Sequence, residues 1–167
     1  MNMHEEKSVQ EMMSALGMAT FQAQALEYSL VTLHAVTVRK NEKPEKNIIQ
    51  DLMDTRYKQT LGRLITDAFK TLDIPISLQE KLKNALEKRN WVTHHFFRKY
   101  GAIVFNVELQ KKVTQELIDI WLFLETVCDA IHELSVQRLK DTGKSEVEIN
   151  KGIEEAVNKY LNELANT

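Results

Sequence analysis

An arginine, an asparagine and two histidines lie close together in the stretch KRNWVTHHFF, residues 88–97. Arg89 has a planar fork of N–H donors that can hold a phosphate through two hydrogen bonds. Histidine changes its charge near neutral pH, so His94 or His95 could transfer protons in a reaction. Asn90 and His94 are four residues apart, a spacing at which a helix lets the amide fix the imidazole's orientation. These residue types suit acid–base chemistry on a phosphate ester.

The stretch falls in the last turns of a predicted helix, 78–98, where Arg89 raises a question of burial. A helical wheel centred on Leu82, at about 100° per residue, puts Arg89 in the middle of the apolar face. The remaining residues of that face are Leu78, Ala85, Leu86, Val92, Phe96 and Phe97. A buried guanidinium needs a partner, because its desolvation costs several kcal/mol. Two explanations stay open: an ion pair with Glu27, Asp67 or Asp119, or a side chain that reaches a cleft and binds phosphate.

Trp91 falls on the opposite side of the same wheel. A tryptophan that points away from the core needs either a second protomer or a stacked base to cover its ring. We expect the protomer, and therefore place Trp91 at a dimer interface.

The periodicity of apolar residues predicts an all-α protein. Hydrophobic residues make up 43% of the chain and charged residues 28%, with only 5 Gly and 2 Pro. The predicted helices are 5–40, 46–72, 78–98, 107–140 and a C-terminal helix within 144–165. Capping boxes are expected at Ser77 with Glu80 and at Ser145 with Glu148, because each serine precedes a glutamate by three residues. Together the predicted helices indicate one domain, an antiparallel bundle of four to five helices over residues 1–167.

Two further expectations concern packing within this bundle. Gly62 inside a helix costs about 1 kcal/mol relative to alanine, so a neighbour should pack against its bare backbone. The C-terminal helix should bury one side, made of Ile149, Ile153, Val157, Tyr160 and Leu164.

A local basic cluster contrasts with the formal charge of −2, which gives the chain no general attraction to nucleic acid. The cluster lies between Lys81 and Lys99 and surrounds the Arg-Asn pair. Lys88, Arg98 and Lys99 are the candidates for contacting the backbone phosphates of a bound strand. The alternative is an ordinary solvated helix face.

Other features exclude several classes of site. The single cysteine, Cys128, excludes an internal disulfide framework. Neither the spacing of a metal site nor a glycine-rich phosphate loop is present, so we expect no metal and no cofactor. The N-terminal residues do not resemble a signal peptide, and the longest strongly apolar run, IWLFL, is far shorter than the roughly 20 residues of a spanning helix. We expect a soluble, cytoplasmic protein without a membrane partner.

The segment RNWVTH, Arg89 to His94, resembles the Arg-Asn-x-x-x-His signature of HEPN domains, a superfamily of nucleotide-binding helical bundles. The continuation HHFFRKYG, the stretch TLGRLI at 60–65 and the long first helix are also similar to small bacterial HEPN-type proteins. The resemblance covers roughly residues 15–135, with 144–165 as an additional C-terminal helix.

This resemblance implies a metal-independent endoribonuclease that acts as a homodimer. Arg89 would bind the scissile phosphate, Asn90 would orient the site, and His94 would transfer the proton, with His95 as a secondary candidate. The RNA 2′-hydroxyl would attack and leave a 2′,3′-cyclic phosphate. The protein could then be a toxin restrained by a cognate antitoxin, or a defence effector. The alternative is a non-catalytic, dimeric interaction or nucleotide-binding module.

One geometric difficulty accompanies these roles. On an ideal α-helix Arg89 and His94 point about 140° apart. We therefore expect either that the arginine curls round the helix or that a second protomer supplies part of the site.

Overall fold

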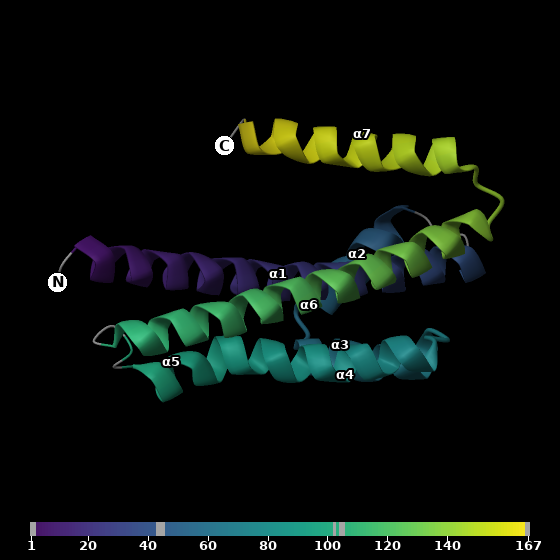
Figure 1. Cartoon of the computed structure of the whole chain (residues 1–167). Helices are drawn as coiled ribbons and strands as arrows, with labels where there is room; N and C mark the ends of the chain where they lie inside the picture. The colour runs from purple at the N-terminus through teal and green to yellow at the C-terminus, as the bar shows by residue number, and fades with distance from the viewer. Residues whose placement is uncertain (1–2, 43–45, 102, 104–105, 166–167) are drawn as a thin grey trace.

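The computed structural model describes residues 3–42, 46–101, 103 and 106–165, and it confirms the all-α prediction: these residues contain helices and no strand. The helices are α1 (Met3–Glu42), α2 (Lys46–Tyr57), α3 (Leu61–Thr71), α4 (Ile76–Asn90), α5 (Phe96–Tyr100), α6 (Val107–Lys140) and α7 (Glu146–Ala165). A short π-helical turn, η1 (Trp91–His95), joins α4 to α5. Figure 1 shows their arrangement.

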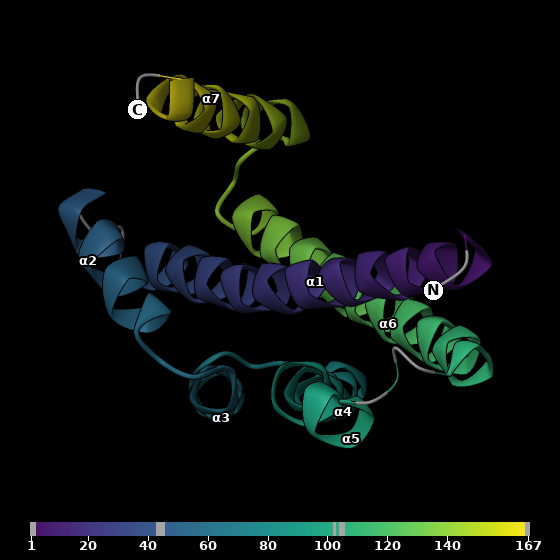
Figure 2. The same cartoon turned by 90° about the vertical axis from the view of Figure 1, so that its left-hand side faces the viewer.

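The two long helices, α1 and α6, form the most extensive contact between elements of the described chain. Both run in the same direction, as their colours show in Figures 1 and 2. An antiparallel order was expected here, and α1 and α6 depart from it because the intervening helices return the chain to the end at which α1 begins. The buried stripes of α1 and α6 meet in the core. Their fully buried members include Ala19, Leu26, Leu117 and Leu124.

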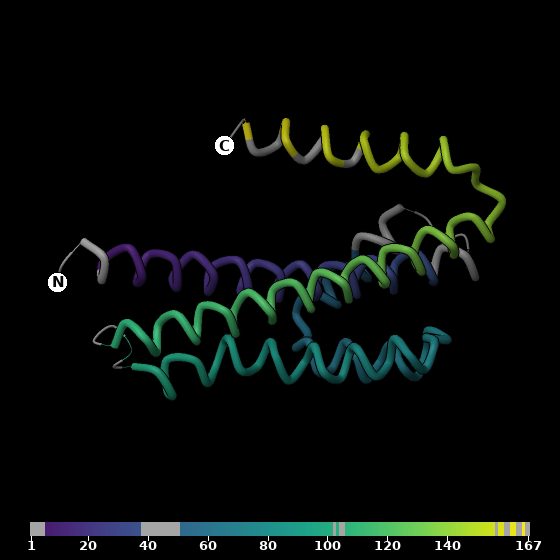
Figure 3. Tube along the Cα trace, viewed as in Figure 1, coloured from purple at the N-terminus to yellow at the C-terminus, as the bar shows by residue number. Residues whose placement is uncertain are grey.

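A layer of α3, α4, η1 and α5 packs against this pair and completes the apolar core. Its buried members include Leu61, Leu64, Leu82, Ala85 and Phe96. Figure 3 traces α4 through η1 into α5 as one continuous rod, antiparallel to α6. The C-terminal end of this rod carries the residues singled out in the sequence.

The prediction of a single helix over 46–72 is wrong, because these residues form two helices, and the start of the second lies at the candidate site. α2 ends at Tyr57, and α3 begins at Leu61. Thr60 takes extended geometry and caps α3, since its side-chain oxygen accepts a hydrogen bond from the Arg63 N–H at 3.4 Å. A threonine hydroxyl can accept a hydrogen bond from a backbone N–H that has no partner within the helix, so threonine favours the start of a helix.

The capping predictions have one success and one failure. Ser145 and Glu148 form the expected box, with the Ser145 N–H donating to Glu148 Oε2 at 2.8 Å and the Glu148 N–H donating to Ser145 Oγ at 3.3 Å. At α4 the expected box is wrong, because the helix begins before Ser77 and is preceded by Pro75, which has no capping side chain.

The apolar side of α7 is exposed, contrary to the prediction. Ile149 is buried, at 4% exposed, whereas Ile153 and Val157 are 42% and 51% exposed. The side chains of Tyr160 and Leu164 lie outside the described residues. Figure 1 shows α7 standing apart from the other helices beyond its link to α6, which agrees with the exposure of Ile153 and Val157.

Among the described residues, no helix combines the length and the apolar character needed to cross a membrane.

Candidate functional site

The π-helical turn lies inside the motif and changes its geometry. Within η1 the backbone N–H of Phe96 donates to the carbonyl of Trp91, five residues earlier, instead of the four of an α-helix. One extra residue is thereby accommodated without breaking the rod. Side chains five apart along this stretch are brought closer than an ideal α-helix allows, and Arg89 and His94 have that spacing.

Arg89 is anchored by Glu27 of α1. One carboxylate oxygen of Glu27 accepts from Nη2 of Arg89 at 2.7 Å and from Nε at 3.2 Å. The two side chains are 22% and 30% exposed, respectively, so the pair is shielded from most of the solvent. Of the three carboxylates considered from the sequence, Glu27 is therefore the partner. Asp67 instead pairs with Arg56 at 2.7 Å, and Asp119 accepts a hydrogen bond from Gln115.

The opposite edge of the same guanidinium reaches the other motif residues. Nη1 of Arg89 donates to Oδ1 of Asn90 at 3.2 Å and lies 3.3 Å from Nε2 of His94. Arginine has no acceptor, so the second contact is a hydrogen bond only when Nε2 carries the lone pair and Nδ1 the hydrogen. The arrangement therefore holds a fixed cation beside a nitrogen that can accept a proton.

These three side chains line a surface hollow of about 330 Å³, which we call the first hollow. Its remaining walls are Thr60, Leu61, Gly62, Leu86 and His95. Thr60 and Gly62 belong to the start of α3, whose partial positive charge favours an anion at this place. The residues TLG of the TLGRLI stretch thus form one wall of this hollow. The sequence feature that could have predicted this wall is Thr60, a helix-capping residue just before an apolar helix.

Gly62 faces Leu86 across this wall. A methyl group added at Gly62 would lie 3.6 Å from Leu86 Cδ2, which is ordinary contact. The expectation that a neighbour packs against this glycine is confirmed.

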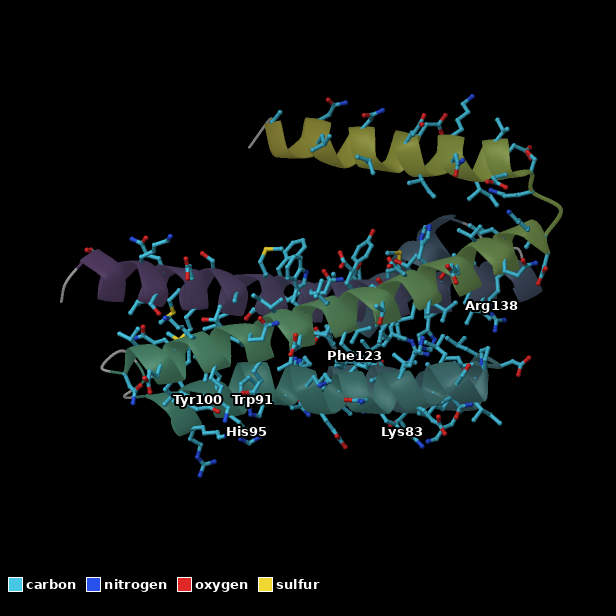
Figure 4. All side chains as sticks on the ribbon, viewed as in Figure 1. Lys83, Trp91, His95, Tyr100, Phe123 and Arg138 are labelled. Atoms are coloured by element: carbon cyan, nitrogen blue, oxygen red, sulfur yellow. The ribbon has the colours of Figure 1, made fainter. Side chains whose placement is uncertain are left out.

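His95 lines the first hollow and also a second one. The second hollow, of about 340 Å³, is lined by Trp91, His95, Arg98 and Lys99. Figure 4 labels Trp91 and His95 near the end of the rod that leads to Tyr100. Neither hollow has a carboxylate in its lining.

Lys88 lies apart from the other proposed phosphate-binding residues. Its Nζ is 5.3 Å from the ring centroid of Phe123 on α6, and it lines neither hollow. The structure therefore brings Arg98 and Lys99 close to the motif but leaves Lys88 on the α6 side of the rod.

The expected outward position of Trp91 is wrong. Trp91 is partly buried against the core, and its ring meets Phe96 edge to face at 5.8 Å and Tyr100 at 6.1 Å. Phe97, expected on the core face, is 64% exposed. The extra residue in the π turn shifts the phase of the wheel for the residues that follow it, Phe97 among them. Trp91 begins the turn, and its ring is covered by Phe96 and Tyr100. A dimer role for Trp91 stays a prediction. The argument for it was that a second protomer should cover an outward ring, and that argument no longer applies.

The remaining titratable groups give no second chemical centre among the described residues. In that part of the chain no three His, Cys, Asp or Glu side chains are grouped so as to hold a metal ion. Cys128 is buried, and burial raises the pKa of its thiol, which disfavours a nucleophilic thiolate.

Comparisons with known proteins give no match: no family model, no curated protein and no solved structure is significantly similar to this chain. The site is accordingly defined by its own residues and geometry.

Proposed function

We propose that this chain is a metal-independent endoribonuclease of the HEPN type, built as a single-domain helical bundle and acting as a cytoplasmic homodimer. The observation that carries the proposal is the approach of Arg89 Nη1 to His94 Nε2 at 3.3 Å, at the edge of an open hollow. A fixed cation and a proton acceptor beside one cavity are what cleavage of RNA requires.

RNA supplies its own nucleophile, the 2′-hydroxyl. In the proposed reaction the bound phosphate draws Arg89 Nη1 to its oxygens, which frees the lone pair of His94 Nε2. Nε2 then takes the hydroxyl proton while the 2′-oxygen bonds to phosphorus and the bond from phosphorus to the 5′-oxygen breaks. The leaving 5′-oxygen takes a proton, and the proposed donor is His95, the secondary catalytic candidate, which lines the same hollow. The products are a 2′,3′-cyclic phosphate and a 5′-hydroxyl end.

Charge on the phosphoryl oxygens is stabilised by two preorganised groups. Arg89 is held by Glu27 through Nε and Nη2, so Nη1 stays at the hollow. The start of α3, which lines the same hollow through Thr60, Leu61 and Gly62, adds the partial positive charge of a helix N-terminus. Fixed donors of this kind commonly supply the largest part of catalysis, because they need no reorganisation in the transition state.

A chelator-resistant cleavage assay tests the proposal. Purified protein is incubated with structured and unstructured RNAs in excess EDTA, and the 3′ ends are tested for a cyclic phosphate. We expect cleavage by the wild type and a loss of about 100-fold or more in His94→Ala, as for removal of a general base. Intact RNA under all these conditions would overturn the proposal.

A toxin role follows from the same activity. Expression in a bacterial host should slow growth for the wild type but not for Arg89→Ala, and a cognate antitoxin would relieve it. Equal growth of the two strains would count against toxicity.

The ion pair of Arg89 with Glu27 favours a second candidate, a non-catalytic dimeric interaction or nucleotide-binding module. In that case Arg89 ties α4 to α1, and His94 only borders the pair. This candidate predicts binding without cleavage, and it predicts that Arg89→Ala lowers stability while His94→Ala changes nothing.

A further inference from the structure

We propose that the second hollow, lined by Trp91, His95, Arg98 and Lys99, binds the nucleotide next to the scissile phosphate, with the base against Trp91 and a phosphate at Arg98 and Lys99. This inference rests on the proposed function, which places the scissile phosphate in the first hollow. It assigns a binding site for one unstacked nucleotide.

The first reason is continuity. His95 is a wall of both hollows, so the two hollows are neighbours on the surface of the rod. Their volumes, about 330 and 340 Å³, are similar and lie at the small end of ligand-sized cavities. Two adjacent hollows of similar size suit two neighbouring units of one polymer.

The second reason is chemical. Arg98 and Lys99 are exposed cations, whereas the lining contains no Asp or Glu. A phosphodiester is the repeating anion that such a surface would attract, and lysine and arginine hold it without regard to sequence.

The third reason is the aromatic ring. Trp91 is fixed by Phe96 and Tyr100, whose rings meet it at interplanar angles of 80° and 70°. A ring held in this way offers a base a rigid surface at little entropic cost, and stacking tolerates every base. Because a base within a duplex is already stacked, the second hollow should prefer single-stranded RNA.

Fluorescence of Trp91 provides the test. The chain has 2 Trp, and Trp121→Phe leaves Trp91 as the single reporter. The probe is an eight-nucleotide RNA methylated at every 2′-oxygen, so that it binds but cannot be cleaved. We expect saturable quenching by the single strand and at least fivefold weaker quenching by the same sequence in a duplex.

Paired substitutions separate the second hollow from general charge. Arg98→Ala with Lys99→Ala should weaken binding at least fivefold and reduce the salt dependence by about one phosphate contact, roughly 0.7 in the slope of log K against log salt. Lys70→Ala with Lys81→Ala removes the same charge from exposed sites at the far end of the α3–α4 pair, and should change binding less than twofold.

The outcomes separate this inference from the proposed function. Cleavage without quenching, or equal weakening by both pairs of substitutions, overturns the nucleotide site and leaves the nuclease standing. Quenching that depends on Arg98 and Lys99, in a protein that cleaves no RNA, supports the nucleotide site and overturns the nuclease.

Discussion

Nη1 of Arg89 lies 3.3 Å from Nε2 of His94, although the two residues are five apart and an ideal α-helix would point them about 140° away from each other. The π turn Trp91–His95 resolves this, since its hydrogen bonds span five residues, the spacing of Arg89 and His94. One chain therefore brings both groups together. The geometric reason for requiring a second protomer disappears, while dimerisation remains a prediction.

Deletion of Thr93 should convert the π turn into an α-helical turn and keep the site. The deletion removes the extra residue, so Arg89 and His94 become four apart, a spacing that shares one face of an α-helix. Thr93 is exposed, and its hydroxyl donates only to the Arg89 carbonyl at 2.9 Å. We expect a melting temperature within a few degrees of the wild type, by circular dichroism, and cleavage within about tenfold.

Thr93→Ala is the matched control, because it removes the hydroxyl but keeps the extra residue. A deletion variant that unfolds while Thr93→Ala stays folded would show that the downstream helix depends on the π turn. A folded but inactive deletion variant would show that the π conformation itself orients His94.

Glu27 should act as a positioning residue for Arg89. Glu27→Ala leaves a partly buried guanidinium without its anchor and should lower the free energy of unfolding by about 1 kcal/mol, discounted for partial exposure. Glu27→Gln keeps an acceptor for the Arg89 donors and should retain more cleavage activity than Glu27→Ala. Urea denaturation and single-turnover cleavage measure the two effects.

The conservative variant makes this test specific. If Glu27 merely stabilised the fold, both variants would cleave normally at a temperature where they are folded. Greater activity in Glu27→Ala than in the wild type would instead mean that the carboxylate competes with the phosphate for Arg89.

The sequence predicts some helices better than others, for local reasons. The predicted bounds of helix 107–140 agree with α6 at both ends. Its apolar stripe is unbroken, and in the structure Asn106 caps its start, with its Oδ1 accepting from the Leu109 N–H. The break between α2 and α3 was missed because apolar residues continue past it, although Thr60 marks a possible helix start. The direction shared by α1 and α6 has no local signal, since it follows from how the intervening helices pack.

The sequence indicated which residues of the candidate site would lie together, but not their geometry. Arg89, Asn90 and His94 do converge, and Glu27 was among the three carboxylates weighed as partners. A helical wheel with a constant step cannot represent a π turn, so it misplaced Phe97, and it did not show that Phe96 and Tyr100 cover Trp91. The second hollow, which combines Trp91 with Arg98 and Lys99, depends on that same turn.

His34 should make the fold less stable as the pH falls. The side chain is 2% exposed, and its pKa is lowered mainly by burial and then by Arg56, against a backbone hydrogen bond with Leu64 and the charge of Asp67. The unfolded chain then takes up a proton before the folded chain does. The free energy of unfolding should therefore decrease as the pH drops below about 6.5, the ordinary value for histidine.

Urea denaturation between pH 7.5 and 5 measures this dependence. His34→Gln removes the titrating group and should flatten the curve, even if it lowers stability at every pH. His132→Gln removes an exposed histidine from α6 and should leave the slope unchanged. Parallel curves for the wild type and His34→Gln would contradict the assignment.

Cys128 should react slowly with thiol reagents in the native protein, and so report on the α1–α6 contact that holds Glu27. The thiol is 9% exposed, and burial raises its pKa, partly offset by hydrogen bonds with Gln22 and Ser29. The thiolate is the reactive form, so labelling by a disulfide reagent at pH 8 should require separation of α1 from α6 and accelerate sharply in guanidinium. Asp129→Cys in a Cys128→Ala background moves the thiol to an exposed neighbouring position and should label at once. Equally fast labelling at both positions would mean that α1 and α6 separate readily, and a rigid Glu27 anchor for Arg89 could not then be maintained.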